Sequence, residues 1–236
     1  MYYVFDAIYG ILRQIQSSEF GPTSTPTPSQ TPSFTPSPSK TPTHTSSPSP
    51  SPTYGSKTVT TLVGGGADPS DRAANFGYVD AIGTNARFDS VRGLTYATVA
   101  GAPTLFLADT LNSVIRRVDL GTLAVTSFAG KAWTGLPTGT NPRCGAQVGG
   151  TWAVNGVGTA AVFCQPTQVK ESGGFLYVAD TWDMCIRKVD IATAAVTTFV
   201  GNSVAGTTGC DTDGTGTNAR FLVSSAPNPP PSALPE

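Results

Sequence analysis

The chain repeats itself, and this constrains its fold more than any other feature of the sequence. Residues 107–119 read LADTLNSVIRRVD, and residues 178–190 read VADTWDMCIRKVD, an offset of 71 residues. Residues 4–16, VFDAIYGILRQIQ, form a weaker third copy. In each copy an aspartate precedes an arginine by seven residues, and the pairs are Asp6 and Arg13, Asp109 and Arg116, and Asp180 and Arg187. Repetition at this spacing indicates one supersecondary unit used several times.

Two further units recur in fixed order with the first. They read VTTLVG, VTSFAG and VTTFVG at residues 59–64, 125–130 and 196–201, and GTNARF, GTAAVF and GTNARF at residues 83–88, 158–163 and 216–221. Short β-rich runs that end at Asp or Gly predict strands. Further short strands at 93–98 and 166–170 complete the unit. Four short antiparallel strands per unit, joined by Gly-rich connections, are typical of a β-propeller blade.

The arginine-bearing strands alternate apolar and polar residues. In residues 114–119, VIRRVD, and 185–190, CIRKVD, this alternation predicts one buried face and one solvated face that carries the Arg and Lys side chains. The basic residues of this kind are Arg116, Arg117, Arg187 and Lys188. The alternative is that they pair with the neighbouring aspartates Asp109, Asp119, Asp180 and Asp190.

The order GTxAxF, a strand, LYVADTxxxxIRKVD and then VTTxxG resembles the NHL repeat family of β-propellers. The resemblance covers residues 57–221 and the N-terminal copy. It implies an all-β fold, a propeller fragment of about two and a half four-stranded blades. There are two departures. The family's proline three residues after the Phe is present only as Pro166, and the period of 66 to 71 residues is longer than usual.

Composition divides the chain into four segments. We expect a partial blade at 1–16, a disordered Ser/Thr/Pro-rich insertion or linker at 17–56, propeller blades at 57–221 and a Pro-rich tail at 222–236. A segment of Ser, Thr and Pro cannot bury apolar area, and both a linker and an O-glycosylated stalk fit its composition.

The repeat register also predicts where this segment lies. It pairs Ile15 with Val59, which predicts an insertion in the turn between the last two strands of a blade. The alternative is a linker between two propellers.

The residue types argue against an enzyme. The one histidine, His44, lies in the Ser/Thr/Pro segment, so a histidine-dependent metal site or a Ser–His triad lacks its base. Asp211, Asp213 and Gly214 resemble the start of a calcium loop, but Leu222 stands where its Glu would be, which favours a Gly-rich turn. We expect no catalytic residue, metal or cofactor. Some NHL-like propellers are lactonases or lyases, so a metal enzyme built on carboxylates alone is one alternative.

Charge and hydropathy limit the classes of partner. The net charge is −1, whereas nucleic-acid binders usually carry a basic surplus. No run approaches the roughly 18 apolar residues of a membrane span. We therefore expect a protein or glycan interaction scaffold without nucleic acid, extracellular or at the cell surface. An intracellular RNA- or protein-binding adaptor is the alternative. Because propellers close with about four to eight blades, we expect this chain to belong to a longer product or to self-associate.

Four cysteines predict two disulfides. The expected pairs are Cys144–Cys164 and Cys185–Cys210, and four free thiols are the alternative.

The long connections between blades predict the binding surface. They span residues 64–92, 131–165 and 201–216, and binding residues often lie on such loops. Their aromatic residues Tyr78, Trp133 and Trp152 are the candidate anchors for a ligand.

Overall fold

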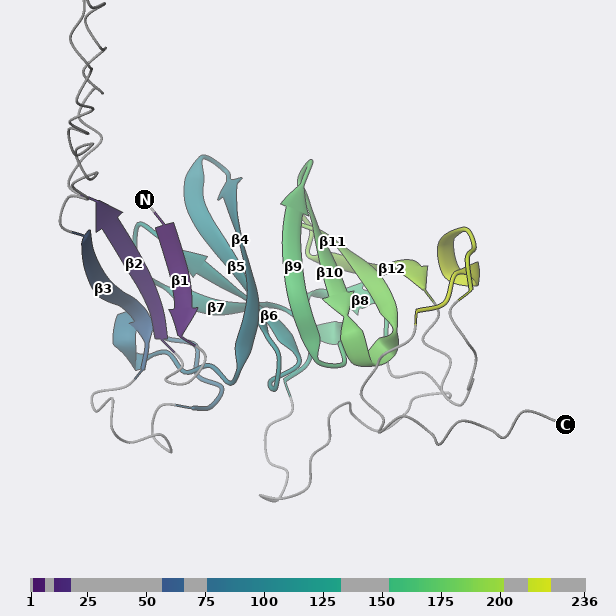
Figure 1. Ribbon diagram of the computed structural model, residues 1–236, viewed down its shortest axis with the longest axis horizontal. Helices are drawn as coiled ribbons and strands as arrows, with labels where there is room; N and C mark the ends of the chain where they lie inside the picture. Colours follow the sequence, from purple (N-terminus) through teal and green to yellow (C-terminus); the bar gives the residue numbers. More distant parts are fainter. Residues whose placement is uncertain are drawn as a thin grey trace, which may run out of the picture.

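The structure is a computed structural model, and it describes residues 2–6, 11–17, 57–65, 76–132, 153–201 and 212–221. These residues form three antiparallel sheets that stand side by side (Figure 1). The first blade comprises β1 (Tyr2–Asp6), β2 (Ile11–Ser17) and β3 (Lys57–Gly64). The second comprises β4 (Val91–Val99), β5 (Ala102–Asp109), β6 (Val114–Asp119) and β7 (Val125–Ala129). The third comprises β9 (Pro166–Ser172), β10 (Phe175–Asp180), β11 (Cys185–Asp190) and β12 (Ala195–Gly201), with β8 (Gly156–Val157) beside β12.

The predicted fold class is confirmed: the described residues form an all-β propeller fragment, and its sheets do not close into a ring. Within the described ranges, no helix is long and apolar enough to span a membrane.

The strand register repeats from blade to blade. A β-bulge precedes the arginine in each blade, between Leu12 and Arg13, Ile115 and Arg116, and Ile186 and Arg187. Ile15 lies opposite Val59 in the first blade, which is the pairing that the repeat register predicts. The residues on either side of 18–56 therefore meet in one sheet. Residues 18–56 and 222–236 lie outside the described residues, so their predicted character stays a prediction.

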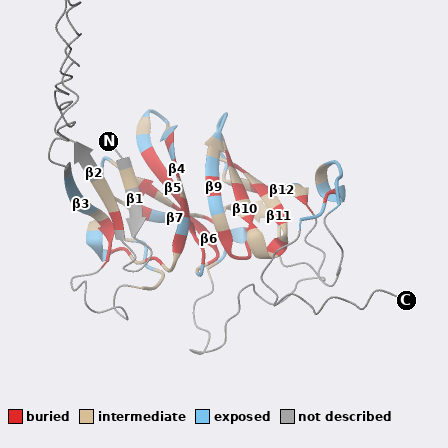
Figure 2. Ribbon diagram, viewed as in Figure 1, coloured by how far each residue is buried: buried red, intermediate tan, exposed pale blue. Residues whose placement is uncertain are grey.

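The hydrophobic core lies between neighbouring blades. Buried residues such as Phe106, Ile115 and Leu176 pack between the second and third blades. Leu12 and Leu105 belong to a second cluster between the first and second blades. Figure 2 shows buried residues along the strands of the second and third blades. A fully buried Leu or Phe contributes about 1.5–3 kcal/mol, so each blade depends on its neighbour for much of its stability.

One segment type joins successive blades. We name residues 79–88, 154–163 and 212–221 the first, second and third linking segments. Each contains a single 3-10 turn, namely η1 (Gly83–Asn85), η2 (Gly158–Ala160) and η4 (Gly216–Asn218). These turns lie against the last strand of the preceding blade, which is β3, β7 and β12 respectively.

The first two linking segments also follow the outer edge of the next blade. The Val125 N–H donates to the Ala81 carbonyl at 2.8 Å, and the Gly158 N–H donates to the Ala194 carbonyl at 2.8 Å. Each of these two segments thus contacts both the blade before it and the blade after it.

Candidate functional site

Two arginines lie at the centre of the second and third blades. Arg116 and Arg187 have no solvent exposure. The prediction that they lie on a solvated face is therefore wrong. Alternation places Arg187 on the same face as Cys185 and Val189, and the sheet is covered there. The alternative, pairing with Asp109 and Asp180, is what the structure shows.

Arg116 joins its strand to the first linking segment. Its Nη1 donates to Asp109 Oδ2 at 2.9 Å and to the Arg87 carbonyl at 3.0 Å. Its Nη2 donates to the Val79 carbonyl at 3.0 Å and to Asp80 Oδ1 at 2.5 Å. The planar guanidinium thus contacts a strand end and both sides of the linking segment, a use of its fixed fork of donors.

Arg187 repeats this arrangement in the third blade. Its Nη1 donates to the Val162 carbonyl at 3.0 Å and to Asp180 Oδ2 at 3.3 Å. Its Nη2 donates to the Val154 carbonyl at 3.2 Å and to Asn155 Oδ1 at 2.8 Å. We name each such set, an arginine with its strand-end aspartate and linking-segment acceptors, an arginine clamp.

Aromatic rings and further donors complete the clamps. The Arg116 guanidinium lies 5.0 Å from the Phe88 ring centre, and that of Arg187 lies 5.4 Å from Phe163. The Asp89 N–H donates to Asp109 Oδ1 at 2.8 Å. Burial raises the pKa of Asp109 to about 6, although Arg116 opposes this. Asp109 and Asp180 therefore compensate the buried charges of Arg116 and Arg187 inside the blades.

One acidic residue next to the third blade's arginine clamp, Asp183, has no acidic counterpart in the second blade. Asp183 stands where the second blade has Asn112, whose amide donates to Asp109 Oδ2 at 3.0 Å. Neither Asp183 oxygen accepts a hydrogen bond within the described part of the chain. Burial, together with the charge of Asp180, raises the pKa of Asp183 to about 9. Asp183 is therefore protonated at neutral pH.

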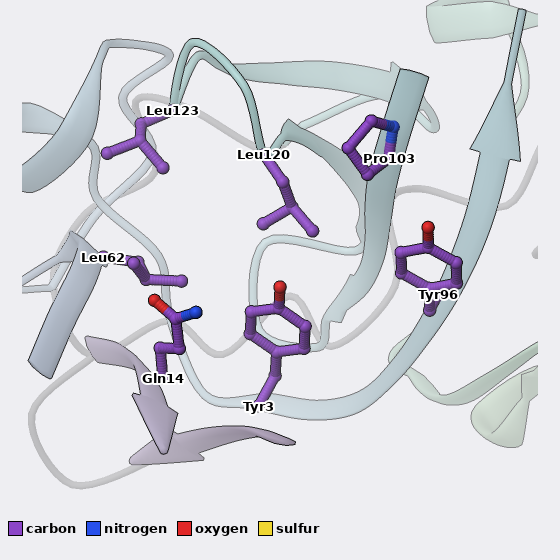
Figure 3. A pocket seen from close by; sticks show the side chains of 7 residues that line it. All are labelled: Tyr3, Gln14, Leu62, Tyr96, Pro103, Leu120 and Leu123. Atoms are coloured by element: carbon purple, nitrogen blue, oxygen red, sulfur yellow. The ribbon is translucent and has the colours of Figure 1, made fainter. Parts of the chain in front are cut away.

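A pocket of about 630 Å³ lies between the first and second blades (Figure 3). Its lining residues are Tyr3, Gln14 and Leu62 from the first blade and Tyr96, Pro103, Leu120 and Leu123 from the second. This volume is within the usual range of ligand pockets, roughly 300–1,000 Å³. Burial, and then the proximity of Tyr96, raise the pKa of the Tyr3 hydroxyl, which is therefore neutral at physiological pH.

Side-chain size accounts for the pocket. Between the second and third blades, Phe106 and Phe128 pack with ring centres 4.8 Å apart. Tyr3 and Leu62 occupy the same repeat positions in the first blade. Because Leu62 lacks the ring of Phe128, the first junction keeps a space that the second one fills.

Two curated proteins are similar in sequence to part of this chain. No family model matches the chain. The chain is 33% identical over 141 residues to NHL repeat-containing protein 2 of Bos taurus, covering 60% of this chain and 17% of that relative. It is 32% identical over 140 residues to the Homo sapiens protein of the same name, covering 58% and 17%. The chain is therefore similar in part to these NHL repeat-containing proteins. The chain spans only 17% of the length of the curated relatives it matches.

Solved structures show weaker likenesses. A structural genomics protein of unknown function from Bacteroides thetaiotaomicron has a TM-score of 0.44 and 22% identity, covering 63% of this chain and 31% of that one. An auxiliary nutrient binding protein from the same organism has a TM-score of 0.37 and 18% identity, covering 59% and 28%.

Of the three predicted binding anchors, only Tyr78 lies within the described residues. Tyr78 lies next to the arginine clamp of the second blade: its ring centre lies 5.0 Å from the Arg116 guanidinium, and its hydroxyl lies 2.5 Å from Ser127 Oγ. Trp133 and Trp152 lie outside the described residues. The assignment of these three aromatic residues to ligand binding stays a prediction.

The predicted Cys185–Cys210 disulfide is wrong, because Cys185 is a free, buried thiol. It lies opposite Gly201 of the paired strand, and a Cβ on that glycine would lie 2.7 Å from the Cys185 Cα. Burial raises the pKa of this thiol. Cys164 is fully buried and is not among the free thiols of the described residues. Its predicted partner Cys144 lies outside those residues, as does Cys210, so the Cys144–Cys164 pair stays a prediction.

Sequence reasoning did not find the pocket. A signal was present, since Leu62 stands where the other VTxxxG units have Phe128 and Phe199. Interpreting it required knowing that this position faces the next blade.

Proposed function

We propose that this protein is a non-catalytic β-propeller scaffold that binds a partner protein, and that the pocket between the first and second blades receives an apolar side chain of that partner. The observation that carries the proposal is the pocket itself, which Leu62, Leu120 and Leu123 line together with two tyrosines. Buried aromatic or aliphatic anchors in such pockets contribute much of the affinity of protein interfaces.

The polarity of the lining favours a protein over a glycan. Among the lining side chains, only Gln14, Tyr3 and Tyr96 carry hydrogen-bonding groups, and none is charged. A sugar needs many paired hydroxyls, because unpaired buried polar groups are costly. A polyanion would gain nothing from an uncharged lining.

The arginine clamps support the non-catalytic part of the proposal. Asp109 and Asp180 are completely buried and paired with Arg116 and Arg187. Their charges already stabilise the blades, and a substrate could reach them only by opening the core.

A variant of Leu62 tests the proposed binding pocket. Leu62→Phe reproduces the residue found at Phe128, so we expect it to fold and to fill the pocket. Peptides selected from a random phage-displayed library against the wild-type chain should lose about tenfold or more of their affinity for this variant. Leu62→Met, which keeps the side-chain volume, is the matched control and should bind almost normally. Peptides that bind the Phe variant and the wild-type chain equally would place the binding surface elsewhere.

The predicted extracellular or cell-surface location is part of this proposal and has a chemical test. Disulfides persist in oxidising compartments. If Cys144 and Cys164 are paired, titration of the unreduced, denatured protein from its natural source should find two free thiols, Cys185 and Cys210. Four free thiols would contradict both the bridge and the location.

A further inference from the structure

The third linking segment has the geometry of the other two but no following blade among the described residues. Thr212 and Arg220 exchange backbone hydrogen bonds at 3.3 and 3.0 Å, as Val79 and Arg87 do at 3.4 and 3.1 Å. Asp213 stands three residues before Gly216, the position that Asp80 and Asn155 hold in the other segments. In those segments the side-chain oxygen of this residue accepts a hydrogen bond from the clamp arginine.

The side chains of this segment are exposed where their counterparts are buried. Phe221 is 43% exposed, whereas Phe88 and Phe163, which lie next to the clamp arginines, have no exposure. Asp213 is exposed and makes no ion pair within the described residues. The segment is therefore an arginine clamp without its arginine.

The first blade has the opposite deficiency. Arg13 holds the register position of Arg116 and follows the same bulge. It is only half-buried, however, and makes no ion pair with a described residue. Val59 is 50% exposed, whereas its counterparts Val125 and Val196 are each 1% exposed. The outer edge of this blade, unlike that of the other two, has no linking segment beside it in the described structure.

A further residue of the first blade, Thr61, can donate a hydrogen bond to the third linking segment. Ser127 Oγ donates to Asp80 Oδ1 at 3.1 Å, and the Ser127 N–H donates to Asp80 Oδ2 at 2.9 Å. Thr61 holds the same register position, opposite Arg13, and is exposed. The first blade therefore presents Arg13 and the Thr61 hydroxyl, which match Asp213. It also presents the apolar side chain of Val59, which matches Phe221.

We propose that two copies of this chain assemble head to tail, with the third linking segment of one copy docked on the outer edge of the first blade of the other. Arg13 of one copy then pairs with Asp213 of the other and lies next to Phe221, and Thr61 donates to the same carboxylate. Residues 214–215 run beside β3 as β8 runs beside β12. Two such junctions related by a twofold axis join six blades, a number within the range of about four to eight in which propellers close.

Charge-reversal variants of the full 236-residue chain test this assembly by mass in solution. The wild-type chain should form a species of twice 24.2 kDa in sedimentation or light-scattering measurements over a range of concentrations. Arg13→Asp and Asp213→Arg should each raise the dimer dissociation constant about 100-fold or more, because each opposes like charges at both junctions. Arg92→Asp, an exposed charge reversal on β4, is the matched control and should remain dimeric.

Mixing separates a lost contact from a misfolded variant. An equimolar mixture of Arg13→Asp and Asp213→Arg can form a heterodimer with one native junction and one charge-swapped junction. We expect the dimer to reappear in the mixture. A monomeric wild-type chain, or a mixture that stays monomeric while the wild type is dimeric, would overturn the proposal.

Discussion

At the scale of single residues, the buried guanidinium groups decide how the blades are held. Arg116 lies inside the second blade with two carboxylates and two carbonyls around it. Removing one partner from a buried ion pair costs about 3–5 kcal/mol, because the other charge stays buried and unpaired. That is a large share of the roughly 5–15 kcal/mol by which domains are stable.

Replacing the clamp arginine should therefore be severe, and replacing its neighbour should not. We expect Arg116→Ala to lower the free energy of unfolding by about 3–5 kcal/mol. Arg117, one residue on, is only partly buried and makes no ion pair with a described residue. Arg117→Ala should change the free energy by less than about 1 kcal/mol. Urea unfolding of both variants measures the difference, and equal effects would refute the clamp.

The protonated Asp183 makes stability depend on pH. Its pKa is about 9 in the folded protein and near 3.9 in the unfolded chain, so between these values the unfolded state binds fewer protons. The stability that protonated Asp183 contributes is fully present below a pH of about 3.9. It is lost progressively as the pH rises from there toward about 9. Asp183→Asn, which copies Asn112, should stabilise the protein more at about pH 8 than at about pH 5.

The reciprocal change is the control. Asn112→Asp puts a second carboxyl beside Asp109 and removes the amide that donates to it. It should destabilise the protein, and increasingly so as the pH rises. A stability gain from Asp183→Asn that does not depend on pH would show that Asp183 is not protonated in the folded state.

At the scale of elements, strand-ending glycines allow successive blades to approach. Gly130 directly follows β7, the last strand of the second blade, with φ of +100°, and a Cβ there would lie 2.8 Å from both Phe163 Cδ2 and the Ser113 carbonyl. Gly101, in the turn between β4 and β5, has φ of +83° but nothing within 4 Å of its Cβ position. A substitution at either glycine would strain the backbone, because both have a positive φ. Only at Gly130 would the new Cβ also clash with neighbouring atoms.

Alanine at these two glycines separates strain from packing. Gly101→Ala should cost about 1–2 kcal/mol for the left-handed backbone alone. Gly130→Ala should cost about 1–3 kcal/mol more, because Phe163 and the Ser113 backbone must move. Thermal unfolding of the two variants measures the difference. If Gly130→Ala is no worse than Gly101→Ala, the close approach between the blades is not real.

The sequence predicts the strands and their register but not which side chains are buried. Ile15 opposite Val59 follows from the repeat spacing, since each blade has the same turn between its last two strands. The burial of Arg187 does not follow from alternation. Alternation places Arg187 on the face of Cys185 and Val189, but it does not show that a charged side chain is buried there, while the face of Lys188 is only half-buried. The pocket at Leu62 also needed the fold, because its walls come from two blades far apart in sequence.

At the scale of the whole molecule, the same arrangement is used at each junction with different outcomes. Between the second and third blades the junction is filled, with Phe106 and Phe128 packed together. Between the first and second blades it is open and lined by apolar side chains. The blades of this chain are thus joined through the clamps, while the side chain at one junction position, Leu62 or Phe128, leaves a space between blades open or fills it.

Arg116 and Arg187 hold the blades together from within, and arginine side-chain NMR can detect this. In a chain labelled with ¹⁵N at arginine, Arg116 and Arg187 should give resolved Nη–H signals that exchange slowly with water, because their Nη atoms donate hydrogen bonds in the core. The exposed Arg92 should exchange fast. Fast exchange at every guanidinium group would contradict the account and return these arginines to a solvated strand face.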